Sequence, residues 1–296
     1  MYLSVKKEGF HQYLLDCNTI APVNKDIVRY LPVKDTFVFE LPLYSPKEYF
    51  QPEGEVLIEF DGNSINTPKL NNEIRIFLMP RCDVNALDKV DKLRWDDKLY
   101  KEKRDKSVII EIPCKEDEKC FCNEVGLKDC YDIKLFEEKN NTYTLHVRTK
   151  KGKKFIESYR EKRPGKDRFT IKNETNLKEN EMVFEKHAQD CLGCTACTIV
   201  CPTCYCFHVE DQNNMGGVKG KRARKASSCL LSDFTKVAGG YVFRETRGKR
   251  LRQRVLHKFY YYKKRFGEYM CVGCGRCRRT CPSGIDFYKI WRGLNG

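Results

Sequence analysis

Two short segments near the carboxyl end of the chain repeat one spacing of cysteines. The first begins at Cys191 and the second at Cys271, and each reads C-x2-C-x2-C-x3-C-P. This is the bacterial ferredoxin pattern for a [4Fe-4S] cluster, and in two-cluster modules the fourth cysteine of each run ligates the other cluster. We therefore expect two clusters with crossed ligands. Cluster 1 takes Cys191, Cys194, Cys197 and Cys281, and cluster 2 takes Cys271, Cys274, Cys277 and Cys201.

Other uses of the cysteines fit this pattern less well. Structural zinc sites bind through two well-separated pairs, not through a run of four close cysteines followed by proline. Disulfide frameworks belong to small secreted chains, whereas this chain has 296 residues, 17 cysteines and no apolar leader after Met1. It also has no apolar run of about 18 residues, the length that a membrane-spanning helix needs. We expect an iron-sulfur protein of the cytoplasm.

A further group of cysteines in the first half of the chain favours a third [4Fe-4S] cluster. Two of them each follow a strand-like run, at residues 74–79 and 108–112, so they emerge at one sheet edge if these strands are neighbours. Two more follow in a short acidic loop. Cluster 3 would take Cys82, Cys114, Cys120 and Cys122. The alternatives are unligated cysteines or a zinc site, and Cys17 and Cys130 are interpreted as structural.

The spacing of apolar residues predicts an α+β chain of two domains. Residues 1–175 alternate strand-like and helical stretches, which is typical of a mixed α/β domain. Residues 176–296 carry the cysteine motifs and are expected to form an α-helical ferredoxin-like domain, including the long segment 202–270 between the motifs. The predicted strands lie at 36–39, 55–60, 74–79, 108–112 and 142–147, and helices of the first domain at 10–17 and 84–93.

One long basic helix is predicted from Arg244 to Phe266. Apolar residues recur in it at spacings of three and four, which indicates a face turned toward a core. Gly248 marks an alternative, later start. The apolar face consists of Leu251, Val255, Phe259 and Tyr262.

The formal net charge of +15 resides in one segment. Residues 221–280 contain 18 Lys and Arg against 3 Asp and Glu, and the charges elsewhere cancel. A [4Fe-4S] cluster on four thiolates carries about two negative charges, so cations around the motifs stabilise it. We interpret part of the excess as compensation for the clusters and the rest as a docking surface for a partner subunit. Binding of nucleic acid is the weaker interpretation.

Three cysteines near the motifs have no predicted ligand role. Cys204, Cys206 and Cys229 are interpreted as small buried hydrophobes or spare thiols near the clusters. The chain has no G-x-G-x-x-G or P-loop motif, and its five histidines form no ligand pair. We therefore expect no catalytic centre and no nucleotide or flavin site of those kinds.

Longer segments around the cysteines resemble a known family. They are Cys-Pro-Thr-Cys-Tyr-Cys-Phe at 201–207, Cys-Val-Gly-Cys-Gly-Arg-Cys at 271–277 and Pro-Arg-Cys-Asp-Val-Asn-Ala-Leu at 80–87. They are similar to the iron-sulfur (beta) subunit of soluble NAD(P)-linked sulfhydrogenases and to the A subunit of anaerobic sulfite reductase. The resemblance implies a cytoplasmic complex in which this subunit relays electrons between a flavin-containing NAD(P)H subunit and a catalytic metal subunit.

Three hypotheses for the function follow. The favoured one is an electron-transfer subunit of an oxidoreductase, with a hydrogenase or a sulfite or sulfur reductase as the catalytic partner and an NAD(P)H subunit or ferredoxin as the other. The second is an iron-sulfur regulator that binds nucleic acid through the basic helix. The third is a free-standing ferredoxin with an added domain.

Overall fold

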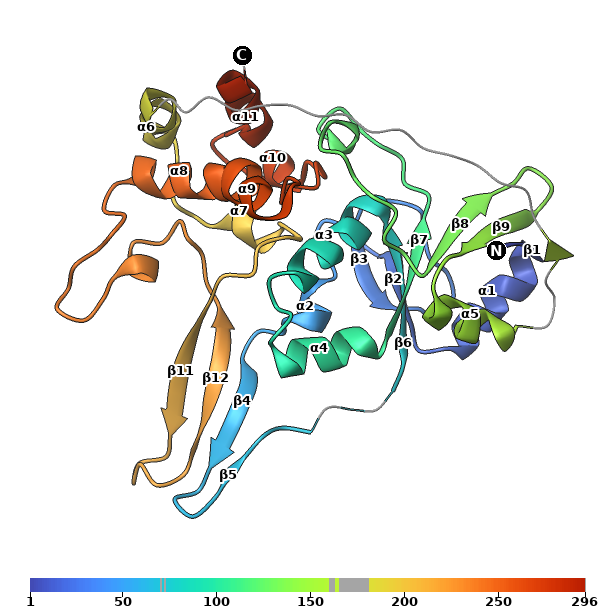
Figure 1. The fold of residues 1–296 in the computed structure, drawn as a ribbon, viewed down its shortest axis with the longest axis horizontal. Coiled ribbons are helices and arrows are strands. Elements are labelled where there is room, and N and C mark those ends of the chain that lie inside the picture. The colour runs from blue at the N-terminus through green and yellow to red at the C-terminus, as the bar shows by residue number, and fades with distance from the viewer. Residues whose placement is uncertain (70, 72, 160–162, 165–180, 296) are drawn as a thin grey trace.

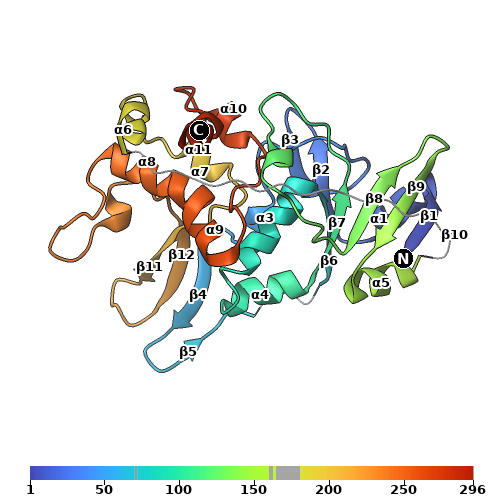
Figure 2. The same cartoon turned by 45° about the horizontal axis from the view of Figure 1, so that its top comes forward.

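The computed structural model describes residues 1–69, 71, 73–159, 163–164 and 181–295. Helices and strands both contribute to it, as predicted for an α+β chain, and the strands form two sheets. The larger sheet belongs to the part of the chain that precedes the first cysteine motif. The helices that carry the two motifs pack together beside it, while the smaller sheet extends away from both (Figures 1 and 2).

The larger sheet has a parallel centre. Strands β2, β6, β7 and β8 are parallel neighbours, and every residue of β7 is buried. A parallel strand covered on both faces needs a nearly continuous apolar run, which is the pattern that predicted β6 and β7. In spatial order the strands are β10 (Arg163–Pro164), β1 (Tyr2–Lys6), β9 (Thr142–Val147), β8 (Ile133–Glu137), β7 (Ser107–Ile112), β6 (Arg75–Pro80), β2 (Thr19–Asn24) and β3 (Val28–Pro32).

Helices cover both faces of this sheet. Side chains of a strand alternate between faces, so Ile76 and Leu78 of β6 enter one core and Phe77 and Met79 enter the other. Helices α1 (Lys7–Asp16) and α5 (Lys150–Glu157) pack on the first face. Helices α2 (Lys47–Phe50), α3 (Arg81–Asp91) and α4 (Lys98–Asp105) pack on the second. The cysteine loops after β6 and β7 therefore leave a rigid, double-covered sheet.

One predicted strand of this domain is wrong. Residues 36–39 form no strand, although Val38 donates a single backbone hydrogen bond to the carbonyl of Pro22. The aromatic rings of Phe37 and Phe39 instead pack against the core on the α1 side of the sheet. An apolar run of four residues is too short for its period to distinguish a strand from a loop that covers a core.

The smaller sheet joins two distant parts of the chain. Strands β4 (Glu55–Phe60) and β5 (Ile65–Asn66) come from the first domain, and β11 (Phe207–Asn213) and β12 (Gly220–Ala226) lie between the cysteine motifs. They pair in the order β11-β12-β4-β5. The helical prediction for residues 202–270 is therefore wrong over this hairpin.

The remaining helices surround the cysteine motifs. The predicted basic helix is continuous from α8 (Arg247–Leu256) through a π-helical turn (His257–Tyr261) to α9 (Tyr262–Phe266), and it buries all four predicted apolar residues. Its start agrees with the later alternative, because the Thr246 side chain caps it by accepting from Lys249 N. The others are α6 (Glu181–Gln189), α7 (Ala196–Ile199), α10 (Arg276–Thr280) and α11 (Phe287–Asn295). Among the described residues, none of the helices combines the length and apolarity needed to cross a membrane.

Buried ion pairs hold the motif helices against the first domain. The guanidinium of Arg276 binds both oxygens of Asp83, at 2.6 and 2.7 Å. Lys89 of α3 binds Glu268 at 2.8 Å. The predicted boundary at residues 175 and 176 lies outside the described residues, but these contacts show that the parts on either side of it pack tightly.

Replacing Glu268 with glutamine should lower the free energy of unfolding by about 2 kcal/mol near neutral pH. The Glu268 side chain is 5% exposed and binds both Lys89 and Lys92. Burial alone would raise the pKa of Glu268, but the hydrogen bonds from the two lysines lower it from 4.5 to about 2.

This stabilisation is present above the unfolded pKa of the carboxyl group and is lost as pH falls through the folded one. Urea titrations of wild type and Glu268→Gln should therefore differ by a constant amount above about pH 5 and converge as the pH falls from about 5 to about 2. A difference that stays constant over this range would contradict the assignment.

Candidate iron-sulfur sites

The four cysteines predicted for cluster 1 border one pocket. Cys191 and Cys194 lie in the loop that leads into α7, Cys197 lies in α7 and Cys281 follows α10, so the two motifs meet at this point. The loop turns through Gly193 and Thr195, whose φ angles of 70° and 62° place three cysteines in a tight bend. Burial raises the pKa of Cys197, and the nearby Cys191 and Cys281 contribute in the same direction. The structure thus brings the last cysteine of the second motif to the first motif.

The cysteines predicted for cluster 2 are also mutual neighbours. Burial raises the pKa of Cys271 to about 12, and the nearby Cys274 and Cys201 add to the shift. Burial and the nearby Cys271 and Cys274 likewise raise the pKa of Cys277. Thiols so close together in a buried site resist joint deprotonation, because their thiolates repel one another. Positive iron at the centre would supply the missing counter-charge, so this donor set fits a metal cluster.

Two glycines allow the second motif to approach the loop of Cys120 and Cys122. A Cβ on Gly273 would lie 2.5 Å from the backbone nitrogen of Cys122, and one on Gly275 would lie 2.5 Å from the carbonyl oxygen of Lys119. Both glycines also have positive φ angles, 64° and 69°. Any side chain at either position would push the two loops apart.

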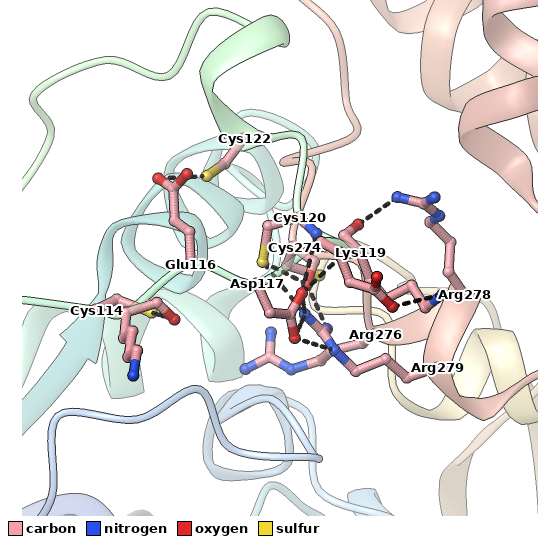
Figure 3. A network of polar contacts seen from close by, with 12 residues as sticks. Cys114, Glu116, Asp117, Lys119, Cys120, Cys122, Cys274, Arg276, Arg278 and Arg279 are labelled. Atoms are coloured by element: carbon pink, nitrogen blue, oxygen red, sulfur yellow. Dashed lines mark hydrogen bonds and ion pairs between the residues drawn. The ribbon is translucent and has the colours of Figure 1, made fainter.

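The cysteines predicted for cluster 3 meet in another pocket. Pro80 at the end of β6 lies opposite Ile112 at the end of β7, so the chain leaves both strands at one edge of the sheet, as predicted. The first turn of α3, which directly follows β6, and the loop after β7 converge on a pocket lined by Cys82, Cys114, Cys120 and Cys122. Figure 3 shows the last three around Glu116, with the Cys122 sulfur 3.2 Å from a Glu116 oxygen. Cys274 lines the same pocket, so the predicted sites of clusters 2 and 3 are adjacent.

A cluster and a single metal ion require different sulfur spacings. In the described part of the chain, no three His, Cys, Asp or Glu side chains are arranged to hold one metal ion. A tetrahedral zinc site would need sulfurs about 3.8 Å apart. In a [4Fe-4S] cubane each thiolate binds a different iron, so the sulfurs must stand further apart.

Cationic side chains lie beside the sulfurs. Arg254 donates to the carbonyl oxygen of Cys197 at 2.6 Å and to the sulfur of Cys204 at 3.3 Å. Arg279 donates to the sulfur of Cys120 at 3.2 Å (Figure 3). Burial alone would lower the pKa of Arg254, but the neighbouring cysteine thiolates outweigh it and raise the pKa. These contacts support the interpretation that part of the basic excess compensates the negative charge of the clusters.

The cysteines without a predicted ligand role fall into two kinds. Cys17 and Cys130 pack against the apolar cores of the first domain. Cys204 is buried beside Cys201. Cys206 and Cys229 contact each other and face a pocket, which the sequence did not predict because 22 residues and a hairpin separate them.

Comparisons with known proteins agree with the cysteine geometry. The family profile of a 4Fe-4S dicluster domain matches residues 190–285, which contain both motifs. Sulfhydrogenase 2 subunit beta of Pyrococcus furiosus is 30% identical over 274 residues, which cover 83% of this chain and 81% of that protein. No solved structure matches the chain significantly. The chain therefore belongs to the family of sulfhydrogenase beta subunits, as an electron-transfer protein with iron-sulfur clusters.

Proposed function

We propose that the chain relays electrons through three [4Fe-4S] clusters inside a cytoplasmic multi-subunit oxidoreductase. A flavin- or NAD(P)H-binding subunit, or a ferredoxin, stands at one end of the relay, and a catalytic metal subunit such as a hydrogenase or a sulfite or sulfur reductase stands at the other. The named relative is itself a subunit of a sulfhydrogenase. All 17 cysteines are free of disulfides, which supports a reducing compartment.

The adjacency of the three cysteine groups carries this proposal. Cys281 lies among the cysteines of the first motif, and Cys274 lies both among the cluster 2 cysteines and at the cluster 3 pocket. The three groups therefore form a series, with cluster 2 in the middle. [4Fe-4S] clusters supply one-electron redox chemistry, and the protein holds them, sets their surroundings and limits solvent access.

The two ends of the series differ in their surroundings. At one end, Cys194 and Leu192 are exposed, so a partner can approach cluster 1 directly. At the other end, Glu116 lies beside the partly exposed Cys122. An apolar end and an end with a carboxylate suit two different partners, as a relay requires.

The internal use of the basic residues argues against the nucleic-acid alternative. Arg254, Lys258 and Arg276 are buried in contacts with the protein itself. Arg222 and Lys225 of β12 are paired with acidic side chains of β11. Much of the local excess is therefore engaged within the chain, and a gel shift should show no tight, salt-sensitive DNA binding.

Replacing Cys114 or Cys120 with alanine should remove one cluster of three. We expect about twelve iron atoms in the anaerobically purified wild-type chain and about eight in either variant. Cys17→Ala and Cys130→Ala are matched controls, because these cysteines pack in the cores of the same domain and should retain about twelve. Iron and sulfide analysis measures all five proteins.

An iron content of about eight in wild type and variants alike would rule out the third cluster and leave a two-cluster relay. Anaerobic isolation of the native protein tests the relay itself. A stable monomer with no oxidoreductase subunit bound would instead support a free-standing ferredoxin.

A further inference from the structure

A pair of thiols lies apart from the three cluster sites. Cys206 directly precedes β11, and Cys229 follows β12 at the same end of the hairpin. The hydrogen bond from Ser227 N to the Cys206 carbonyl, at 2.9 Å, extends the strand pairing and closes this end. The two side chains are near neighbours that line one pocket, and both residues are partly exposed. The fold therefore holds together two reactive groups that the electron relay does not use.

The pair opens into a pocket with a partly exposed cation, Arg244, in its wall. The cavity has a volume of about 280 Å³ and is lined by both thiols and Arg244, and also by Arg254 and Lys258, whose side chains are buried and bind protein atoms. Phe207 and Phe234 add aromatic surface, and none of the lining residues is acidic. A pocket of this size and charge suits a small anion with an apolar body.

The two cysteines have unequal acidity. The interaction with Cys206, with help from Arg254 and Lys258, lowers the pKa of Cys229. The same interaction and burial raise the pKa of Cys206. Cys229 is therefore the more acidic thiol and serves as the nucleophile, and Cys206 is the thiol that can resolve a mixed disulfide.

We propose that Cys206 and Cys229 form a redox-active dithiol that reduces small anionic disulfides in this pocket. The Cys229 thiolate attacks one sulfur of the substrate RSSR, which forms a mixed disulfide and releases one RS⁻. Cys206 then loses its proton and attacks the Cys229 sulfur, which releases the second RS⁻ and forms a Cys206–Cys229 disulfide. Overall, two protein thiols and RSSR give a protein disulfide and two RSH, so the electron pair passes from the protein to the substrate.

The test uses 5,5′-dithiobis(2-nitrobenzoate), a small dianionic disulfide whose thiolate product is coloured. The anaerobic holoprotein should release two product thiolates more than the Cys206→Ser/Cys229→Ser double variant, and mass spectrometry should find a Cys206–Cys229 disulfide. Cys206→Ser should release one more than the double variant and retain a mixed disulfide on Cys229. Cys229→Ser should react no faster than the double variant. Equal release from wild type and the double variant, or no Cys206–Cys229 disulfide, would overturn the proposal.

A second variant tests the cationic wall. Arg244→Gln should slow the reaction with this dianion about tenfold. The reaction with neutral 2-hydroxyethyl disulfide should slow much less, because it loses only the contribution of Arg244 to the acidity of Cys229. Equal rates for wild type and Arg244→Gln with the dianion would overturn the anion specificity. Iron content, measured on each variant, should equal that of wild type, so this experiment can fail while the electron relay stands.

Discussion

Replacing Asp83 with alanine should lower the free energy of unfolding by about 3–5 kcal/mol. The side chains of Asp83 and Arg276 are 0% and 1% exposed, and their guanidinium-carboxylate contact has two hydrogen bonds, at 2.6 and 2.7 Å. Without the carboxylate, the buried guanidinium keeps one hydrogen bond, to the Pro42 carbonyl oxygen, and its charge is left uncompensated. The two parts of the chain should then separate more easily, and anaerobic urea titration followed by aromatic fluorescence measures the loss.

An exposed pair of the same geometry provides the control. Arg222 also binds both oxygens of its partner, Asp211, at 2.6 and 2.7 Å, but the two side chains are 49% and 40% exposed. Water solvates these charges when either partner is removed, so Asp211→Ala should leave the urea midpoint almost unchanged. Similar losses in the two variants would contradict the view that burial makes the Asp83 contact important.

A double replacement at Asp83 and Arg276 distinguishes the effect of the unpaired charge from the effect of lost packing. Asp83→Leu together with Arg276→Met removes both buried charges and keeps most of the volume, so it should recover a large part of the stability lost in Asp83→Ala. A double variant as unstable as Asp83→Ala would mean that the packing of these side chains, and not the unpaired charge, causes the loss.

The sequence predicted the cysteine ligands whose positions depend on local spacing. The runs beginning at Cys191 and Cys271 place their cysteines within short segments of the chain, so the motif alone indicates the chemistry. Cys82 and Cys114 were predictable for a different reason. Each follows a buried apolar run, and two such runs pair as parallel strands whose carboxyl ends meet.

The sequence did not predict contacts between distant segments. The sequence does not distinguish Arg276 from the other cations of the basic segment, because its ion-pair partner Asp83 lies 193 positions away. The β11–β12 hairpin was read as helix, although Asn214, Gly216 and Gly217 mark a turn, because its strands are rich in polar residues. Strand β12 also pairs with β4, which is a tertiary contact that local propensity does not contain.

The crossed ligation of clusters 1 and 2 leads to a prediction about the iron content of double variants. Cys281 lies in the second motif but borders the pocket of the first, so we expect Cys194 and Cys281 to bind the same cluster. Cys194→Ala and Cys281→Ala should each remove about four iron atoms, and the double variant should also remove only about four. Each substitution breaks the same cluster, so their effects do not add.

A second double variant should lose twice as much iron and serves as the matched control. Cys194 and Cys201 belong to one sequence motif, but Cys201 lies among Cys271, Cys274 and Cys277. Crossed ligation therefore predicts that Cys194→Ala/Cys201→Ala removes about eight iron atoms, because two clusters are broken. If each motif instead bound its own cluster, this variant would lose about four and Cys194→Ala/Cys281→Ala about eight. Because the two arrangements exchange these values, iron analysis of two proteins decides between them.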